Sequence, residues 1–129
     1  MPVVRIDAPS ALPENRLKAL ADAVHSGLVT AMNVPPSDRF QIINRHDAAT
    51  LLIDPAYPGV SRTAEAVIVA VALRAGRTDE QKPAFYKAVV AQAERVGGFK
   101  RDDILIALSE NTLIDWSFGR GEVFPPPGN

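Results

Sequence analysis

The sequence contains one pattern twice, at an offset of 64 residues. Each copy has an apolar run typical of a strand, then a stretch with helical spacing, then a second apolar run. At this offset Pro2 coincides with Ala66, Asp38 coincides with Asp102, and the two predicted helix starts coincide. A helix that joins two strands over so short a distance makes them parallel, with a right-handed crossover. The repeat therefore predicts two β-α-β units.

The first unit begins with a strand over residues 2–8. A helix is predicted from Glu14 to about Met32, because its apolar residues recur every three or four positions and form one stripe. A strand from Arg39 to Arg45 follows, and a weaker one is predicted over Thr50–Ile53. The helical stripe consists of Leu17, Leu20, Ala21, Val24, Leu28 and Ala31.

The second unit begins with the uninterrupted apolar run Ala66–Leu73, which is typical of a strand buried on both faces. The segment from Thr78 to Gln81 has the capping-box pattern and opens a helix to about Val96, which Gly97-Gly98 ends. We expect this helix to bury Phe85, Val89, Ala93 and Val96, and Ile104–Leu108 to form the last strand.

Joined together, the two units predict an α/β (α+β) fold: a mostly parallel four-stranded sheet with both helices on one face. We expect a single domain over residues 1–129, with repeats at about 2–60 and 65–115 and a C-terminal arm. The sheet face opposite the helices would be apolar, so the pattern indicates that copies of the chain cover it for one another.

Composition excludes several classes of function. The net charge of −1 gives no basis for binding nucleic acid or an anionic membrane. Without cysteine and with only two histidines, a thiolate or histidine-rich metal site is not expected, and no other cofactor is indicated. No signal peptide or membrane-spanning run is present. We expect a cytoplasmic protein without nucleic-acid or membrane partners.

Pro2 is the first candidate for chemistry. A small second residue allows Met1 to be removed, and Pro2 would then carry a secondary amine on a rigid ring. Such an amine can act as a base, as an acid, or as a nucleophile that forms an iminium ion with a carbonyl. The alternative is a proline that merely opens an edge strand, where its missing N–H costs nothing.

Arg74 lies at the end of the second unit's first strand and Arg77 at the entry of its helix. Paired guanidinium donors beside a helix start suit a carboxylate. Two solvated loop arginines are the alternative interpretation. Asp38 precedes a strand and is by default a turn residue or strand cap. Trp116 and Phe118 are by default core or interface residues.

Three segments carry a resemblance to a known family: Val34-Pro35-Pro36-Ser37-Asp38-Arg39-Phe40-Gln41, Arg77-Thr78-Asp79-Glu80-Gln81-Lys82 with Phe85-Tyr86-Lys87, and Asp115-Trp116-Ser117-Phe118-Gly119-Arg120-Gly121. With Pro2 at a strand start and two β-α-β units, the chain resembles the tautomerase superfamily over almost its whole length. Within that superfamily it is most similar to the malonate semialdehyde decarboxylase family.

The resemblance implies that Pro2 and Asp38 are catalytic and that Arg74 and Arg77 bind the substrate. It also implies a pocket lined by the aromatic side chains of Phe40, Trp116, Phe118 and Phe124, a homotrimer, and catalysis without a cofactor. The family separates its two arginines by one residue, whereas Ala75-Gly76 separate them here.

The predicted function is decarboxylation of a small 3-oxo acid (malonate semialdehyde-like) by the amino-terminal proline. A promiscuous hydratase or tautomerase activity is compatible with this prediction. One alternative is a keto–enol tautomerase of a 2-oxo acid in which Pro2 is the general base. The other is a trimeric binding module without catalysis.

Overall fold

A computed structural model describes residues 1–124. Its main elements are β1 (Pro2–Pro9), α1 (Glu14–Met32), β2 (Gln41–His46), β3 (Val67–Arg74), α2 (Gln81–Gly97) and β4 (Ile104–Asn111). Short 3₁₀ turns at Arg101–Asp103 and Leu113–Asp115 flank β4. None of the helices in this part of the chain is apolar over a length sufficient to span a bilayer. The proline run of the predicted arm, Pro125–Pro127, lies outside the described residues.

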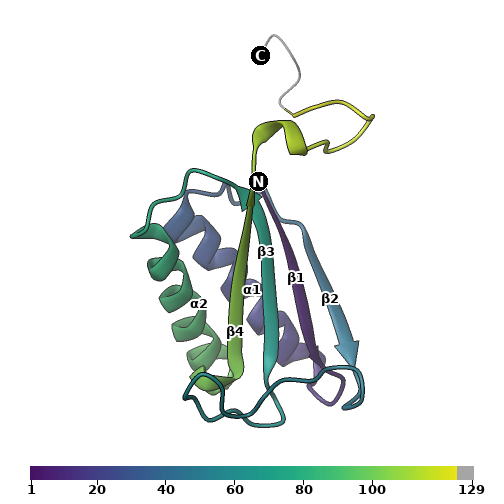
Figure 1. Cartoon of the computed structure of the whole chain (residues 1–129), viewed down its shortest axis with the longest axis vertical. Helices are drawn as coiled ribbons and strands as arrows, with labels where there is room; N and C mark the ends of the chain where they lie inside the picture. Colours follow the sequence, from purple (N-terminus) through teal and green to yellow (C-terminus); the bar gives the residue numbers. More distant parts are fainter. Residues whose placement is uncertain (125–129) are drawn as a thin grey trace.

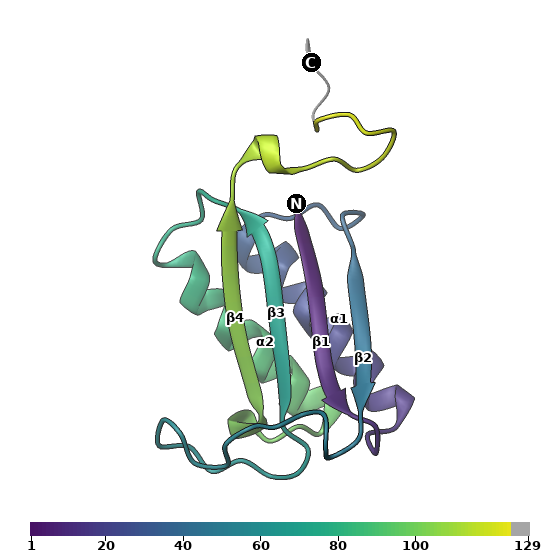
Figure 2. The same cartoon turned by 45° about the vertical axis from the view of Figure 1, so that its right-hand side comes forward.

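The strands form one sheet in the order β2-β1-β3-β4, with both helices on the same face (Figures 1 and 2). β1 and β2 are parallel, as are β3 and β4, so the predicted pair of β-α-β units is confirmed. The two units meet through an antiparallel pairing of β1 with β3, which makes the sheet mixed. This pairing places Pro2 opposite Leu73, so the start of β1 lies beside the end of β3.

The core lies between the sheet and the two helices. Alternate side chains of β1 and β3 point into it, as the period of a strand requires. In a single chain β3 is covered on one face only: Val67, Val69 and Val71 are buried, whereas Ile68 and Ala70 on the opposite face are half-buried. We call this opposite surface the open face.

The predicted helix faces are mostly confirmed. The stripe of α1 is buried except for half-buried Ala31, and α2 buries Phe85, Val89 and Ala93. The prediction for Val96 is wrong, since this side chain is 57% exposed. Gly98 takes a left-handed conformation (φ 68°) that turns the chain back, and Phe99 fills the core in place of Val96.

The weak strand predicted over Thr50–Ile53 is not formed. Asp47 instead stabilises a turn, with its carboxylate accepting the Ala49 N–H at 2.9 Å, and irregular structure follows. This segment borders a hollow of about 320 Å³ at the end of the sheet where β1 and β2 finish. The hollow is lined by residues that include Ser10, His46 and Ala66.

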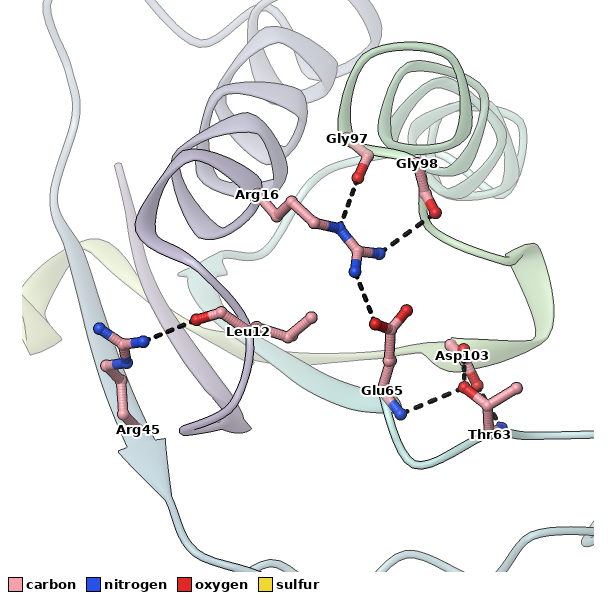
Figure 3. A network of polar contacts seen from close by, with 8 residues as sticks. All are labelled: Leu12, Arg16, Arg45, Thr63, Glu65, Gly97, Gly98 and Asp103. Carbon is pink, nitrogen blue, oxygen red and sulfur yellow. Dashed lines mark hydrogen bonds and ion pairs between the residues drawn. The ribbon is translucent and has the colours of Figure 1, made fainter.

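Arg16 joins the start of α1 to the end of α2 at the same end of the sheet (Figure 3). Its guanidinium donates to the carbonyl oxygens of Gly97 (2.9 Å) and Gly98 (3.1 Å) and pairs with Glu65 (2.6 Å). It also lies 4.7 Å above the ring of Phe99. One side chain thus satisfies the last carbonyls of a helix and holds the loop that leads into β3.

Replacing Arg16 by methionine is expected to lower the free energy of unfolding by about 1–2 kcal/mol, because the part-buried Gly97 carbonyl loses a charged donor while the bonds to the more exposed Gly98 and Glu65 contribute less. Denaturant unfolding would measure the change, with Arg95→Met on the exposed side of α2 as the matched control. The hydrogen bond from Arg16 holds the pKa of Glu65 below its ordinary 4.5. The difference in free energy of unfolding between wild type and Arg16→Met should therefore be largest above about pH 4.5. It should become smaller as the pH falls through the lowered pKa of Glu65. A difference independent of pH would exclude a contribution from Glu65.

Candidate active site

The predicted catalytic residues meet at the end of the sheet where β1 begins and β3 and β4 end (Figure 2). The terminal ammonium group of the described chain belongs to Met1, and it lies 2.9 Å from Oδ2 of Asp38. Pro2, the next residue, is buried at the start of β1. The amino-terminal end of the chain is therefore held by a carboxylate.

Local structure explains the position of Asp38. The prolines before it end α1, and a turn closes when the Asp38 N–H donates to the Pro35 carbonyl at 2.9 Å. The Phe40 carbonyl then accepts the Val4 N–H, which fixes this segment against β1. Asp38 is thus both the turn residue of the default interpretation and the partner of the terminal amine. Its second oxygen, Oδ1, is buried without a hydrogen-bond partner among the described residues.

Arg74 ends β3 and Arg77 precedes α2; we call residues 74–77 the arginine loop. Arg77 is half-buried, and its Nη1 donates to the Arg74 carbonyl at 3.1 Å. Burial lowers the pKa of Arg77, and the charge of Arg74 lowers it further, while Asp38 and Glu110 act in the opposite direction. Neither arginine forms an ion pair within residues 1–124. Two neighbouring guanidiniums without counter-charges favour binding of an anion.

The start of α2 contributes less to anion binding than its sequence suggested. The predicted capping box is formed: the Thr78 N–H donates to Gln81 Oε1 at 2.9 Å, and the Gln81 N–H donates to Thr78 Oγ1 at 3.1 Å. These donors are consequently satisfied within the chain. The guanidiniums of the arginine loop remain as the main donors for a carboxylate.

Four aromatic side chains form a continuous cluster that we call the aromatic arch: Phe40, Trp116, Phe118 and Phe124. Trp116 stacks on Phe118 at 5.5 Å between ring centroids, and Phe118 contacts Phe40 (5.4 Å) and Phe124 (5.1 Å). The arch runs from the segment after β4 to the segment before β2. Since β1 and β3 lie between those strands, the C-terminal segment passes beyond the end of the sheet at which the N-terminus lies (Figure 2).

Two residues of this region, Glu110 and Asn111, escaped the sequence analysis. Glu110, near the end of β4, forms an ion pair with Lys82 of α2. Asn111 accepts the indole N–H of Trp116 at 2.6 Å. The parallel pairing of β4 with β3 was predicted, but the predicted strand ended at Leu108, whereas β4 continues to Asn111 and so brings these residues to the arginine loop.

The two histidines lie in other hydrogen bonds. His25 of α1 contacts the Pro36 carbonyl at 2.8 Å. His46 contacts Asp7 at 2.7 Å, toward the far end of β1. The described part of the chain has no group of three side chains able to hold a metal ion.

The site therefore combines an amino terminus held by a carboxylate, two unpaired guanidiniums and an aromatic wall. Guanidiniums bind a carboxylate through paired donors. An amine can polarise or attack a carbonyl, or transfer a proton beside it. The arrangement suits a small carboxylate that also carries a carbonyl or enol group.

Comparison with known proteins gives matches over most of the chain. The model of a family described as "Tautomerase enzyme" matches residues 38–119, and a second with the same description matches residues 2–60. "Probable tautomerase YusQ" of Bacillus subtilis (strain 168) is 35% identical over 121 residues, which cover 94% of this chain and 95% of that protein.

Two solved structures have the same fold at a similar level of identity. A malonate semialdehyde decarboxylase studied for its decarboxylase and hydratase activities matches with a TM-score of 0.86 and 35% identity, over 93% of this chain and 92% of that one. FG41 malonate semialdehyde decarboxylase inhibited by 3-bromopropiolate matches with a TM-score of 0.86 and 38% identity, over 93% and 91% of the two chains.

Proposed function

The chain belongs to the tautomerase family of enzymes, and on that premise we propose that it decarboxylates a small 3-oxo acid of the malonate semialdehyde type. The observation that carries the proposal is the pair of neighbouring guanidiniums, Arg74 and Arg77, which form no ion pair among the described residues and lie at the same end of the sheet as the amine held by Asp38. The similarity to two malonate semialdehyde decarboxylases supports the same reaction.

Pro2 is the reactive group in this proposal, once Met1 has been removed. When the bond to the carboxylate breaks, CO2 leaves and the electron pair forms the double bond of an enol. The carbonyl oxygen accepts a proton from the Pro2 ammonium. The enol later takes a proton from water at carbon and returns its hydroxyl proton to the Pro2 amine, which gives the aldehyde. A covalent route is also open, in which the Pro2 amine displaces the carbonyl oxygen as water and the resulting iminium accepts the electron pair to become an enamine; protonation of the enamine at carbon and hydrolysis then release the aldehyde and the amine.

Asp38 and the arginine loop have complementary parts in the reaction. Asp38 would form an ion pair with the Pro2 ammonium, as its Oδ2 does with the Met1 ammonium at 2.9 Å in the structure. Arg74 and Arg77 bind the carboxylate and can hold it out of the carbonyl plane, which aligns the breaking bond with the π system. The aromatic arch excludes water and so favours the loss of carboxylate charge as neutral CO2.

A keto–enol tautomerase of a 2-oxo acid is the second candidate, because the curated relative is itself described as a probable tautomerase. In that reaction neutral Pro2 would move a proton between oxygen and carbon. No observation favours the alternative of a binding module without catalysis.

A substrate panel separates the two candidates. The purified protein, with its amino terminus identified by mass spectrometry, would be assayed with 3-oxo acids for CO2 release and with enol forms of 2-oxo acids for ketonisation. We expect 3-oxo acids to be turned over with the higher kcat/KM, and activity to fall as the amine deprotonates. Faster ketonisation, with a rate that rises on deprotonation, would establish the tautomerase instead.

We further propose that three copies of the chain assemble through the open face. The strands place Ile42, Ile68 and Ala70 on this surface, and Ile42 is 43% exposed in the single chain. Burial of such apolar area is worth roughly 25 cal/mol per Å². The face is not wholly apolar, because Arg5 and Asp7 of β1 also lie on it, but covering its apolar part would stabilise an assembly.

Replacing Ala70 by arginine in the middle of the open face is expected to convert the trimer into monomers, because the new guanidinium would lie beside Arg5, its partner in register on β1, and two like charges would have to be buried together. Sedimentation velocity at micromolar concentration would measure the change. Ala91→Arg, on the exposed side of α2, is the matched control and should remain a trimer. A wild-type protein that sediments as a monomer would exclude the assembly.

A further inference from the structure

We propose that Asn111 is a positioning residue that connects the aromatic arch to the arginine loop and so fixes the distance between the two walls of the pocket. It touches neither the terminal amine nor Asp38 through any hydrogen bond of the described chain. The expected effects on kcat/KM rest on the proposed function. The expected effect on the packing of Trp116 can be measured independently of any activity.

Asn111 makes two hydrogen bonds, and each holds a different part of the site. It is the last residue of β4 and is paired in register with Arg74, the first residue of the arginine loop. Its backbone carbonyl accepts the Ala75 N–H at 2.8 Å, which continues the strand pairing into that loop. Its side-chain Oδ1 accepts the indole N–H of Trp116 at 2.6 Å. The two walls thus share one residue as their anchor.

A local turn brings Trp116 back to Asn111. The Asp115 carboxylate accepts the N–H of Thr112 at 2.8 Å, and the Asp115 N–H donates to the Thr112 carbonyl at 3.0 Å. This capping box reverses the chain directly after β4. The turn determines where the Trp116 backbone lies, and the hydrogen bond that its indole N–H donates to Asn111 determines how the ring is oriented.

The orientation of Trp116 affects the whole arch. Its ring is nearly parallel to that of Phe118, with an angle of 11° between the planes, and Phe118 in turn contacts Phe40 before β2. Trp116 is only 8% exposed in the single chain, so its burial does not depend on a second copy. If the indole lost its acceptor, the ring could rotate, and Phe118 would lose the surface on which it stacks.

Two substitutions separate the hydrogen bond from the charge at this position. Asn111→Leu preserves approximate size but removes the acceptor for the indole. Asn111→Asp keeps an acceptor oxygen but adds a negative charge next to the arginine loop. Asn15→Leu, on the exposed first turn of α1, is the matched control.

Trp116 is the only tryptophan of the chain, so quenching of its fluorescence by acrylamide reports directly on the arch. Asn111→Leu is expected to increase quenching and to lower kcat/KM by roughly threefold to tenfold, the range for one hydrogen bond. Asn111→Asp is expected to keep wild-type quenching and kcat but to raise KM, because the added charge competes for the arginines. Asn15→Leu should change neither quantity.

Wild-type quenching in a folded Asn111→Leu protein would overturn the inference. If that variant fails to fold by circular dichroism, Asn111→Asp decides: wild-type quenching with a raised KM supports the connection, and altered quenching overturns it. The two proposals can fail separately. If the wild type decarboxylates no 3-oxo acid but Asn111→Leu still increases quenching, the proposed reaction is wrong, whereas the role of Asn111 as anchor of the arch is supported.

Discussion

Replacing Pro2 by alanine, with Met1 still removed, is expected to lower decarboxylation by about a hundredfold or more, the low end of what a positioned acid or base contributes. Alanine keeps a terminal amine, so the substitution tests the secondary amine and its ring. The ring fixes φ near −65° and directs the nitrogen, whereas a primary amine samples other orientations. A secondary amine also forms an iminium that cannot lose an N–H proton, which keeps the electron acceptor charged.

The fold and assembly of the Pro2→Ala protein should be unchanged, because Pro2 lies at the very start of β1. Steady-state kinetics, thermal melting and sedimentation would measure the three properties, after mass spectrometry has confirmed the new amino terminus. Pro9→Ala, at the far end of the same strand, is the matched control and should retain activity. Full activity of Pro2→Ala would show that the terminal proline is not the reactive group.

Replacing Arg77 by alanine is expected to lower kcat/KM by about tenfold to a hundredfold, since hydrogen bonds to charged groups contribute roughly 1.5–3 kcal/mol. Arg77 is half-buried beside Arg74 and has no counter-charge of its own among the described residues. Its loss therefore removes a donor that only a bound anion would satisfy. Stability should be unchanged or increased, because one of two repelling charges is removed.

Arg77→Lys gives a sharper version of the same experiment. Lysine keeps the positive charge but not the paired, planar donors, so an intermediate kcat/KM is expected if a carboxylate is bound through both oxygens. Arg95→Ala, on the exposed last turn of α2, is the matched control. Equal activity of Arg77→Ala and Arg95→Ala would place Arg77 outside the substrate site.

Most of the architecture could be predicted from the sequence because it follows from local hydrophobic period. The apolar stripe between Glu14 and Met32 predicted α1 at its observed bounds, and the run Ala66–Leu73 predicted β3 to within one residue. Two such units joined by short crossovers leave few possible topologies. The capping box from Thr78 to Gln81 was readable for the same reason, since its reciprocal hydrogen bonds depend only on spacing.

The relative orientation of the two units could not be predicted in this way. Nothing in the local pattern of Val3–Asp7 or Ile68–Leu73 specifies that these strands pair in opposite directions. That pairing nevertheless decides which loops meet at the site. Asn111 and Glu110 were missed because the apolar run that predicted the last strand ends at Leu108, whereas β4 continues through polar residues to Asn111.

The error at Val96 has a different origin. The spacing of Phe85, Val89 and Ala93 extends to Val96 on an ideal helix, and the next glycines were correctly taken as its end. A left-handed Gly98 returns the chain toward the core, however, and allows Phe99 to pack there. Phe99, the larger side chain, therefore occupies the core position predicted for Val96. The spacing of apolar residues within the helix cannot show that a residue beyond its end will pack there.

The antiparallel junction of β1 and β3 also means that the sheet has two geometrically equivalent ends, of which one is without the reactive groups. At the offset of 64 residues, Ala66 corresponds to Pro2 and Ser10 to Arg74. Both line the hollow of about 320 Å³ at the opposite end of the sheet, which is therefore the rotated counterpart of the active site. Asp102, the counterpart of Asp38, accepts the backbone N–H of Ser61 at 2.9 Å and so stabilises the linker between the units. A peptide bond replaces the amine at this end, so each chain has one candidate reactive terminus although its two repeats give the sheet two similar ends.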